Sequence, residues 1–169
     1  WKTLFDLEAM RPGMVLLSAQ APDGDPAWCD VVTLMTPVAT RPWKAWEGCA
    51  PGRRPEAYTA LKAAMTQATV DFACARLPEL RDAIAHTYAA TPLTYRHYTG
   101  APHGAAYGLL KDWRSIMASH IPARTKFDNL LLTGQNLTVH GAIGVTLSAA
   151  ATCSEIVGTE YLAKKIANA

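Results

Sequence analysis

The sequence predicts an α+β fold in which antiparallel strands and helices precede a terminal strand–loop–helix. Three observations predict it. Two runs rich in Val, Leu and Thr, at 13–20 and 29–38, flank a segment with turn residues. Apolar residues recur at helical spacing after Pro55. The apolar run 130–133 stops at Gly134, and a polar loop and an alanine-rich segment follow.

Composition restricts the class of protein. The chain has 169 residues, of which 50% are hydrophobic, and 16 basic residues nearly balance 14 acidic ones. The longest basic runs are pairs, such as Arg53-Arg54, so no nucleic-acid partner is expected. The four cysteines show no CxxC spacing, which excludes a zinc motif and is typical of a reducing compartment. We therefore expect no metal site and a cytoplasmic location.

The amino-terminal half is predicted to hold a β-hairpin and then a loop. The two Val- and Leu-rich runs are joined by APDGDPAW at 21–28, whose Asp-Gly step and prolines predict a turn. Segment 40–55 carries three prolines with Trp43 and Trp46, so we expect a loop anchored by its indole rings.

One long helix is predicted from Pro55 to about Arg76. Proline suits the first turn of a helix, where an N–H has no intrahelical partner. Apolar residues spaced three or four apart then define one face, which is best explained as core packing; these are Tyr58, Leu61, Met65, Ala68, Phe72 and Ala75. The Leu77-Pro78 step should end the helix, and a short turn should follow at 78–82.

The segment after this helix should contain a strand and a second helix start. The pattern AIAHTYAAT at 83–91 predicts a strand, and Thr91-Pro92 predicts an N-cap followed by proline at the first helical position. The segment from Thr91 to Gly108 is then rich in tyrosine, histidine and glycine. This segment either lines a cleft for a flat or long apolar ligand or covers the edge of a core.

The carboxyl-terminal loop is the strongest candidate for a binding site. Ligands of open α/β sheets bind outside the carboxyl ends of strands, and Gly134 follows such a predicted end. Gly141 and Gly144 flank the start of a helix expected at about 143–157, whose free N–H groups carry positive partial charge. Gly158 should stop this helix, with Thr159 capping a short terminal one. Spacing alone also fits a turn and a helix start that bind nothing.

Two long motifs resemble one family. NLLLTGQNLTVHGAIGVTLSAAATCSEIV at 129–157 resembles the carboxyl-terminal flavin-binding segment of FAD-dependent oxidoreductases of the phytoene desaturase, carotenoid isomerase and retinol saturase group. The saturase-like branch is the most similar, because it shares the LTGQ step. ATPLTYRHYTGAPHGAAYGL at 90–109 and QAPDG at 20–24 match further segments in the same order. The resemblance thus covers most of the chain.

The resemblance implies that FAD carries hydride chemistry on an isoprenoid or polyene-like substrate. Backbone N–H groups beside the flavin could then stabilise negative charge as the ring accepts hydride. The cofactor-binding residues implied are Gly134, Gln135, Asn136, His140, Gly141, Ala142, Ile143 and Gly144. The substrate-binding residues implied are Tyr95, Tyr98 and Tyr107. No catalytic residue is implied.

The chain departs from the family pattern in two ways. Gln135 stands where related flavoproteins often carry an acidic residue after the glycine. The amino-terminal GxGxxG motif that holds the FAD pyrophosphate is also absent from these 169 residues. We therefore expect residues 1–126 to be a substrate-domain-like region and 127–169 to be the terminal strand–loop–helix of an FAD-binding domain. Trp1 would lie inside a longer α/β flavoprotein, and the fragment alone would be inactive.

Several partners and alternatives follow. The expected partners are the amino-terminal remainder of the flavoprotein and an apolar isoprenoid-like molecule, with peripheral membrane contact and self-association of the fragment as further expectations. One alternative is a fragment of a flavin amine oxidase-like enzyme, against which the TPLT segment argues. The other is a binding or interaction module without redox chemistry.

Overall fold

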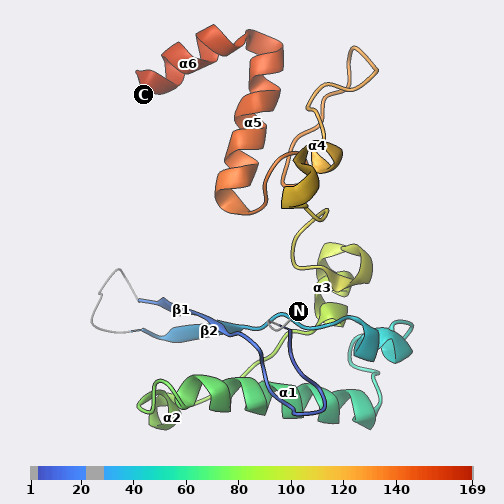
Figure 1. Ribbon diagram of the computed structural model, residues 1–169, viewed down its shortest axis with the longest axis vertical. Helices are drawn as coiled ribbons and strands as arrows, with labels where there is room; N and C mark the ends of the chain where they lie inside the picture. The colour runs from blue at the N-terminus through green and yellow to red at the C-terminus, as the bar shows by residue number, and fades with distance from the viewer. Residues whose placement is uncertain (1–3, 22–28, 169) are drawn as a thin grey trace. The chain divides into compact units, whose positions relative to one another are not determined.

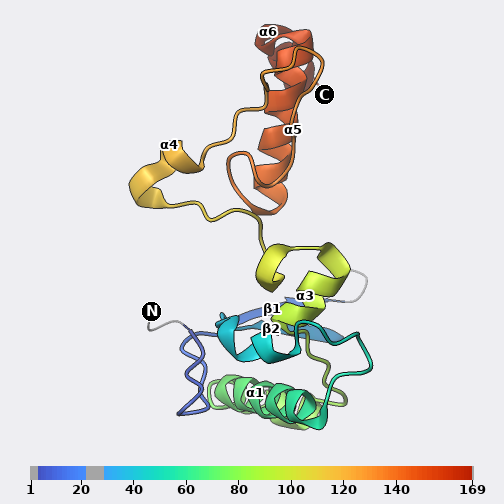
Figure 2. The same cartoon turned by 90° about the vertical axis from the view of Figure 1, so that its right-hand side faces the viewer.

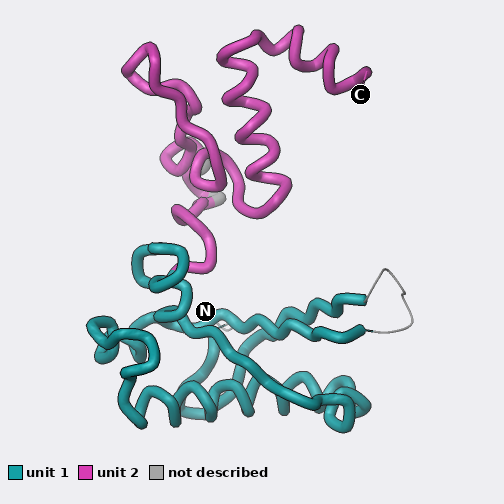
Figure 3. The backbone as a smooth tube through the Cα atoms, turned by 180° about the vertical axis from the view of Figure 1, so that it is seen from behind, with its two compact units in different colours: residues 1–104 teal, residues 105–169 magenta. Residues whose placement is uncertain are grey.

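The computed structural model describes residues 4–21 and 29–168. It divides the chain into two compact units, residues 1–104 and 105–169, which are coloured separately in Figure 3. The functional boundary expected at 126/127 remains a prediction, because the division into compact units does not test it.

The first unit contains the hairpin and the long helix. β1 (Leu16–Gln20) pairs antiparallel with β2 (Val31–Met35), with Ser18 opposite Thr33, as the sequence predicted. The turn expected between them falls largely at residues 22–28, outside the described residues. Figures 1 and 2 both show the hairpin alongside α1 (Glu56–Cys74).

α1 confirms the predicted helix and its apolar face. Pro55 is its N-cap, so the helix begins one residue later than the proline. Tyr58 and Met65 are buried in one cluster with Phe5, Trp43 and Leu93. Of the predicted stripe only Ala75 is exposed, because it is the C-cap, where the helix leaves the core.

The tryptophan loop is a short 3₁₀ helix, η2 (Arg41–Trp46). Trp43 lies edge-on to Trp46 and Tyr58, at ring-centroid distances of 6.2 and 5.6 Å. Edge-to-face geometry is favourable for aromatic pairs and adds to the burial of their surface. The expectation that the indoles anchor this segment is confirmed.

The strand predicted at 83–91 is wrong. The short helix α2 (Leu80–Ala83) is followed by a segment that forms no ladder with any described residue, and Tyr88 in this segment is exposed. Ile84 and Ala89 instead line a groove of about 590 Å³ beside α1. β-propensity alone does not make a strand, because the backbone groups need a neighbouring strand to bond.

α3 (Pro92–Thr99) begins as predicted, with Thr91 as N-cap and proline at the first position. The N–H of Thr91 donates to Thr94 Oγ1 at 3.1 Å, as in a capping box. The Thr91 hydroxyl shares a 2.9 Å hydrogen bond with Tyr58 OH, which ties α3 to α1. Gly100 ends the helix in the left-handed conformation. The 3₁₀ turn η3 (Pro102–Gly104) closes the unit.

The second unit consists of short turns and two helices. η4 (Trp113–Ser115) and α4 (Ile116–Ser119) precede a long loop, which leads into α5 (Gly141–Val157) and α6 (Thr159–Ala167). Gly158 separates the last two helices with a φ of 85°. Gly158 is therefore the stop that was predicted, but it is also the N-cap of α6, a role expected of Thr159.

The strand predicted at 130–133 is reduced to an isolated antiparallel bridge between Leu131 and Arg124. Side-chain hydroxyls take two carbonyls that a strand would offer to a neighbour. Leu130 O accepts from Thr125 Oγ1 at 2.8 Å, and Leu132 O accepts from Thr152 Oγ1 at 2.7 Å. The segment is therefore extended but is not part of a sheet among the residues described.

Candidate cofactor-binding loop

The start of α5 offers backbone donors that the protein does not use. Within the described part of the chain, the N–H groups of Gly141, Ala142 and Ile143 donate no hydrogen bond, and the N-cap His140 makes no side-chain cap. The side chain of Ile143 is 78% exposed. Unpaired N–H groups and the helix dipole together favour an anionic or electron-rich oxygen at this position.

Two glycines shape this helix start for different reasons. Gly141 has a φ of 80°, which other residues rarely adopt, and a Cβ there would meet no atom within 4 Å. Gly144 is buried, and a Cβ there would lie 2.0 Å from Val139 O. Gly141 thus leaves open space in front of the free amides, whereas Gly144 lets the loop backbone pack against the helix.

His140 is held by a ring contact. Its imidazole stacks on Tyr107, with centroids 5.6 Å apart and planes 11° from parallel. Its Nε2 is buried and has no hydrogen-bond partner among the described residues. A buried polar atom normally has a partner, so this nitrogen is a candidate contact for a bound group.

The remaining predicted cofactor residues lie in the turn before His140. Gly134 has a φ of 107°, and its carbonyl accepts from Leu137 N–H at 3.3 Å. Gln135 is half-buried in this turn. Asn136 faces the protein with one side-chain atom, since its Oδ1 accepts from Leu109 N–H at 2.9 Å. The structure therefore brings the predicted cofactor residues together in one turn and helix start.

Lys111 is a residue that sequence reasoning missed. Its ammonium donates to the carbonyls of Ser119, Asn136 and Leu137. Nothing in the pattern GLLKDW signals these contacts, because all three acceptors are backbone atoms distant in sequence.

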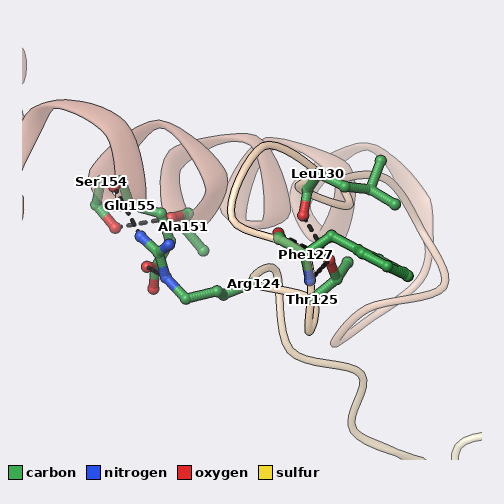
Figure 4. A network of polar contacts seen from close by, with 7 residues as sticks. All are labelled: Arg124, Thr125, Phe127, Leu130, Ala151, Ser154 and Glu155. Carbon is green, nitrogen blue, oxygen red and sulfur yellow. Dashed lines mark hydrogen bonds and ion pairs between the residues drawn. The ribbon is translucent and has the colours of Figure 1, made fainter.

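Polar contacts also fasten the loop to the flank of α5. Thr138 Oγ1 lies 3.3 Å from Ser148 Oγ. Figure 4 shows Arg124 reaching the carboxyl-terminal part of α5, where its Nε donates to Glu155 Oε2 at 2.8 Å. Both side chains are partly exposed, so this ion pair contributes at most about 1 kcal/mol.

The three tyrosines expected to contact substrate belong to two units. Tyr95 and Tyr98 lie on α3 in the first unit, and Tyr98 packs edge-on against His97. Tyr107 lies in the second unit, on His140. Within the second unit, Tyr107 therefore lies beside the candidate loop.

The described residues contain no candidate membrane span and no candidate metal site. Their helices include none with the length and apolarity needed to cross a membrane. Their His, Cys, Asp and Glu side chains form no group of three that could hold a metal ion.

Comparison with known proteins gives matches to one kind of enzyme. The chain is 29% identical over 143 residues to all-trans-retinol 13,14-reductase of Homo sapiens and 30% identical to that of Macaca fascicularis, which is 79% of this chain and 23% of each relative. These matches support a retinol saturase-like relationship. A Danio rerio protein named inactive all-trans-retinol 13,14-reductase also matches, at 28% identity over 115 residues.

The retinol saturase-like relationship rests on part of the length of each relative. The chain spans about a quarter of the length of the curated relatives it matches. No protein-family model matches the chain. No solved structure matches it. The wider resemblance to phytoene desaturases and carotenoid isomerases stays a prediction.

Proposed function

We propose that this chain is the carboxyl-terminal part of an FAD-dependent oxidoreductase that acts on carbon–carbon double bonds of a retinoid or similar polyene. The observation that carries the proposal is the similarity to retinol 13,14-reductases over 79% of the chain. Chemistry on an apolar polyene also fits a cytoplasmic protein in peripheral contact with a membrane. The amine oxidase and non-catalytic alternatives have no matching relative to favour them.

The residues at the start of α5 fit such a cofactor. Bound FAD would supply the transfer of hydride to or from the substrate carbon. The N–H groups of Gly141, Ala142 and Ile143 would donate to an electron-rich edge of its ring system. The unpaired His140 Nε2 would contact the same edge. Because these donors are fixed before binding, they stabilise negative charge without reorganising.

The remainder of the longer polypeptide completes the proposed site. This chain lacks the GxGxxG motif that would hold the pyrophosphate, so the fragment alone should bind FAD weakly and be inactive. Intact protein is therefore the material for the decisive experiment. It should be purified with all coding sequence upstream of Trp1, examined for flavin absorbance, and incubated with all-trans-retinol, a carotenoid and an amine under reducing conditions.

The expected result is bound flavin and a retinoid product that has lost one double bond. Absence of flavin from the intact, folded protein would overturn the proposal. Bound flavin with turnover of the amine alone would support the amine oxidase alternative instead. Bound flavin without turnover of any of these three compounds would indicate a protein without this activity, like the relative that is named inactive.

A pair of variants tests whether the start of α5 is the cofactor contact. Gly141→Ala and Gly158→Ala change glycines at opposite ends of α5, with φ values of 80° and 85° and open space around each Cβ position. Each introduces backbone strain of about 1 kcal/mol or more, because alanine rarely adopts a positive φ. Gly141→Ala keeps the N–H but places a Cβ in the open space before the free amides and strains the φ that orients them, so it should lower FAD affinity roughly tenfold, equivalent to one hydrogen bond, whereas Gly158→Ala should not. Equal affinities would contradict the assignment.

A further inference from the structure

We propose that Lys111 is a positioning residue for the cofactor-binding loop, through both its hydrogen bonds and its charge. This inference rests on the proposed function, because it assigns a role to a residue behind the proposed flavin contact. It is carried by a set of contacts between segment 107–111 and segment 136–140, which we call the loop clamp.

The loop clamp holds Asn136, Leu137 and His140, and contacts with α5 hold the two residues between them. Lys111 Nζ donates to Asn136 O at 2.6 Å and to Leu137 O at 3.0 Å. The next three positions are held by a contact of Thr138 with Ser148, by close packing of Val139 O on Gly144, and by stacking of His140 on Tyr107. These contacts continue up to the residue that precedes the free amides of α5.

The other half of the clamp comes from the residues just before Lys111. Leu109 N–H donates to Asn136 Oδ1. A Cβ on Gly108 would lie 1.6 Å from that same oxygen, so any side chain at 108 would displace the Asn136 amide. Segment 107–111 therefore lies close to the loop, and the glycine at 108 leaves the room that the Asn136 amide occupies.

The charge of Lys111 is what makes it more than a packing residue. Its three acceptors are neutral carbonyls, and the described part of the chain provides no carboxylate within salt-bridge distance. The neighbouring Asp112 is instead paired with Arg114 at 3.2 Å. An ammonium without a counter-charge adds to the positive potential of the α5 amino terminus, which favours an electron-rich or reduced flavin.

Three substitutions in the intact flavoprotein separate geometry from charge. Lys111→Gln keeps N–H donors but removes the charge, and Lys111→Arg keeps the charge. Lys126→Gln removes the same charge from an exposed lysine of the same unit that makes none of the loop-clamp contacts. The readouts are FAD affinity, the midpoint potential of the flavin, and hydrogen exchange of the amides of 134–140.

We expect Lys111→Gln to weaken FAD binding about tenfold, from the loss of one charge-assisted hydrogen bond, to lower the midpoint potential and to speed exchange in the loop. Lys111→Arg should restore most of the affinity and potential, and Lys126→Gln should match wild type. Wild-type affinity and potential in Lys111→Gln would overturn the inference, even if the thermal stability fell, because Lys111 would then only support the fold.

A second variant covers the case in which Lys111→Gln does not fold. Asn136→Ala removes the acceptor of Leu109 N–H and leaves every charge in place, so it should speed loop exchange and weaken FAD binding without changing the potential. Unchanged exchange and affinity would overturn the loop clamp. Absence of flavin from wild type would instead refute the proposed function, and loop exchange in the Lys111 and Asn136 variants would still decide whether the clamp exists.

Discussion

The two units are stabilised by different means. In the first, a buried cluster of large apolar side chains joins the amino-terminal segment, η2, α1 and α3 around Trp43 and Tyr58. In the second, Leu137 is the one large apolar side chain buried among those described, and many leucines, valines and isoleucines are exposed. Its candidate site is held by polar contacts, above all those of Lys111 and Asn136.

This difference shows which unit has an apolar core of its own. A core of aromatic rings in edge-to-face contact stabilises the first unit from within. The exposed apolar residues of α5, which include Ile143, Leu147 and Ile156, need further surface to cover them in a stable protein. That need agrees with the proposal that the second unit functions with the remainder of a longer polypeptide.

The largest effect on stability is expected at Trp43, which is 2% exposed. Trp43→Ala should remove about 3–5 kcal/mol from the free energy of unfolding of the first unit, since it empties the centre of the aromatic cluster. Urea denaturation followed by far-UV circular dichroism measures this. Tyr88→Ala, at a 93% exposed aromatic residue, is the control and should change stability by less than about 0.5 kcal/mol. Similar losses in both variants would refute the core assigned here.

Leu137 tests the second unit in the same way. It is 4% exposed, and Leu137→Ala should cost about 2–3 kcal/mol, the lower part of the range for a buried leucine, because few buried side chains surround it. Hydrogen exchange of α5 amides reports the loss. Leu110→Ala, at an 81% exposed leucine, should leave exchange unchanged. A loss as large as that of Trp43→Ala would show that the second unit has a stronger core than its contacts indicate.

A smaller effect is expected at the polar edge of the aromatic cluster. Tyr58 OH bonds Thr91 Oγ1 and accepts from Arg54 Nη1 at 2.7 Å. Tyr58→Phe keeps the ring but leaves these partners unsatisfied, so it should cost about 1–2 kcal/mol. Comparison with Tyr88→Phe, at an exposed tyrosine, isolates the buried hydroxyl. No difference between the two would mean that burial of the ring alone anchors α3.

The smallest expected effect depends on pH and lies beside the loop clamp. The backbone N–H of Arg114, and then its guanidinium, lower the pKa of Asp112 below its usual value. The folded pKa is the lower one, so this stabilisation is full above the unfolded pKa and is lost as pH falls through the folded pKa. Asp112→Asn should therefore be slightly less stable than wild type at neutral pH and equal to it in acid.

Acid titration of unfolding for wild type, Asp112→Asn and Asp128→Asn checks this prediction. Asp128→Asn makes the same change in charge at another exposed aspartate of the second unit. A gap between wild type and Asp112→Asn that persists unchanged at low pH would contradict the assigned cause.

Prediction from sequence succeeded where the signal is local. The pairing of the two hairpin strands, the stripe on α1, the Thr91-Pro92 helix start and the Gly158 stop each depend on a few neighbouring residues. It failed for the strands at 83–91 and 130–133, because strand formation depends on a partner that periodicity does not reveal. The clustering of Gly134 to Gly144 followed from their closeness in sequence, whereas the roles of Lys111 and Gly108 did not.

By itself, the sequence determined the helices, the hairpin and the position of the glycine loop, because backbone conformation is set by residues a few positions apart. Only the tertiary structure decided which polar groups of the loop are paired: Lys111 binds the carbonyls of Asn136 and Leu137, whereas His140 Nε2 is buried without a partner among the described residues. The physical reason is that a hydrogen bond depends on which atoms lie close together in the folded chain, not on their separation in sequence. Whether a donor is free depends on residues far away in sequence, such as Asn136 for the N–H of Leu109, 27 positions earlier.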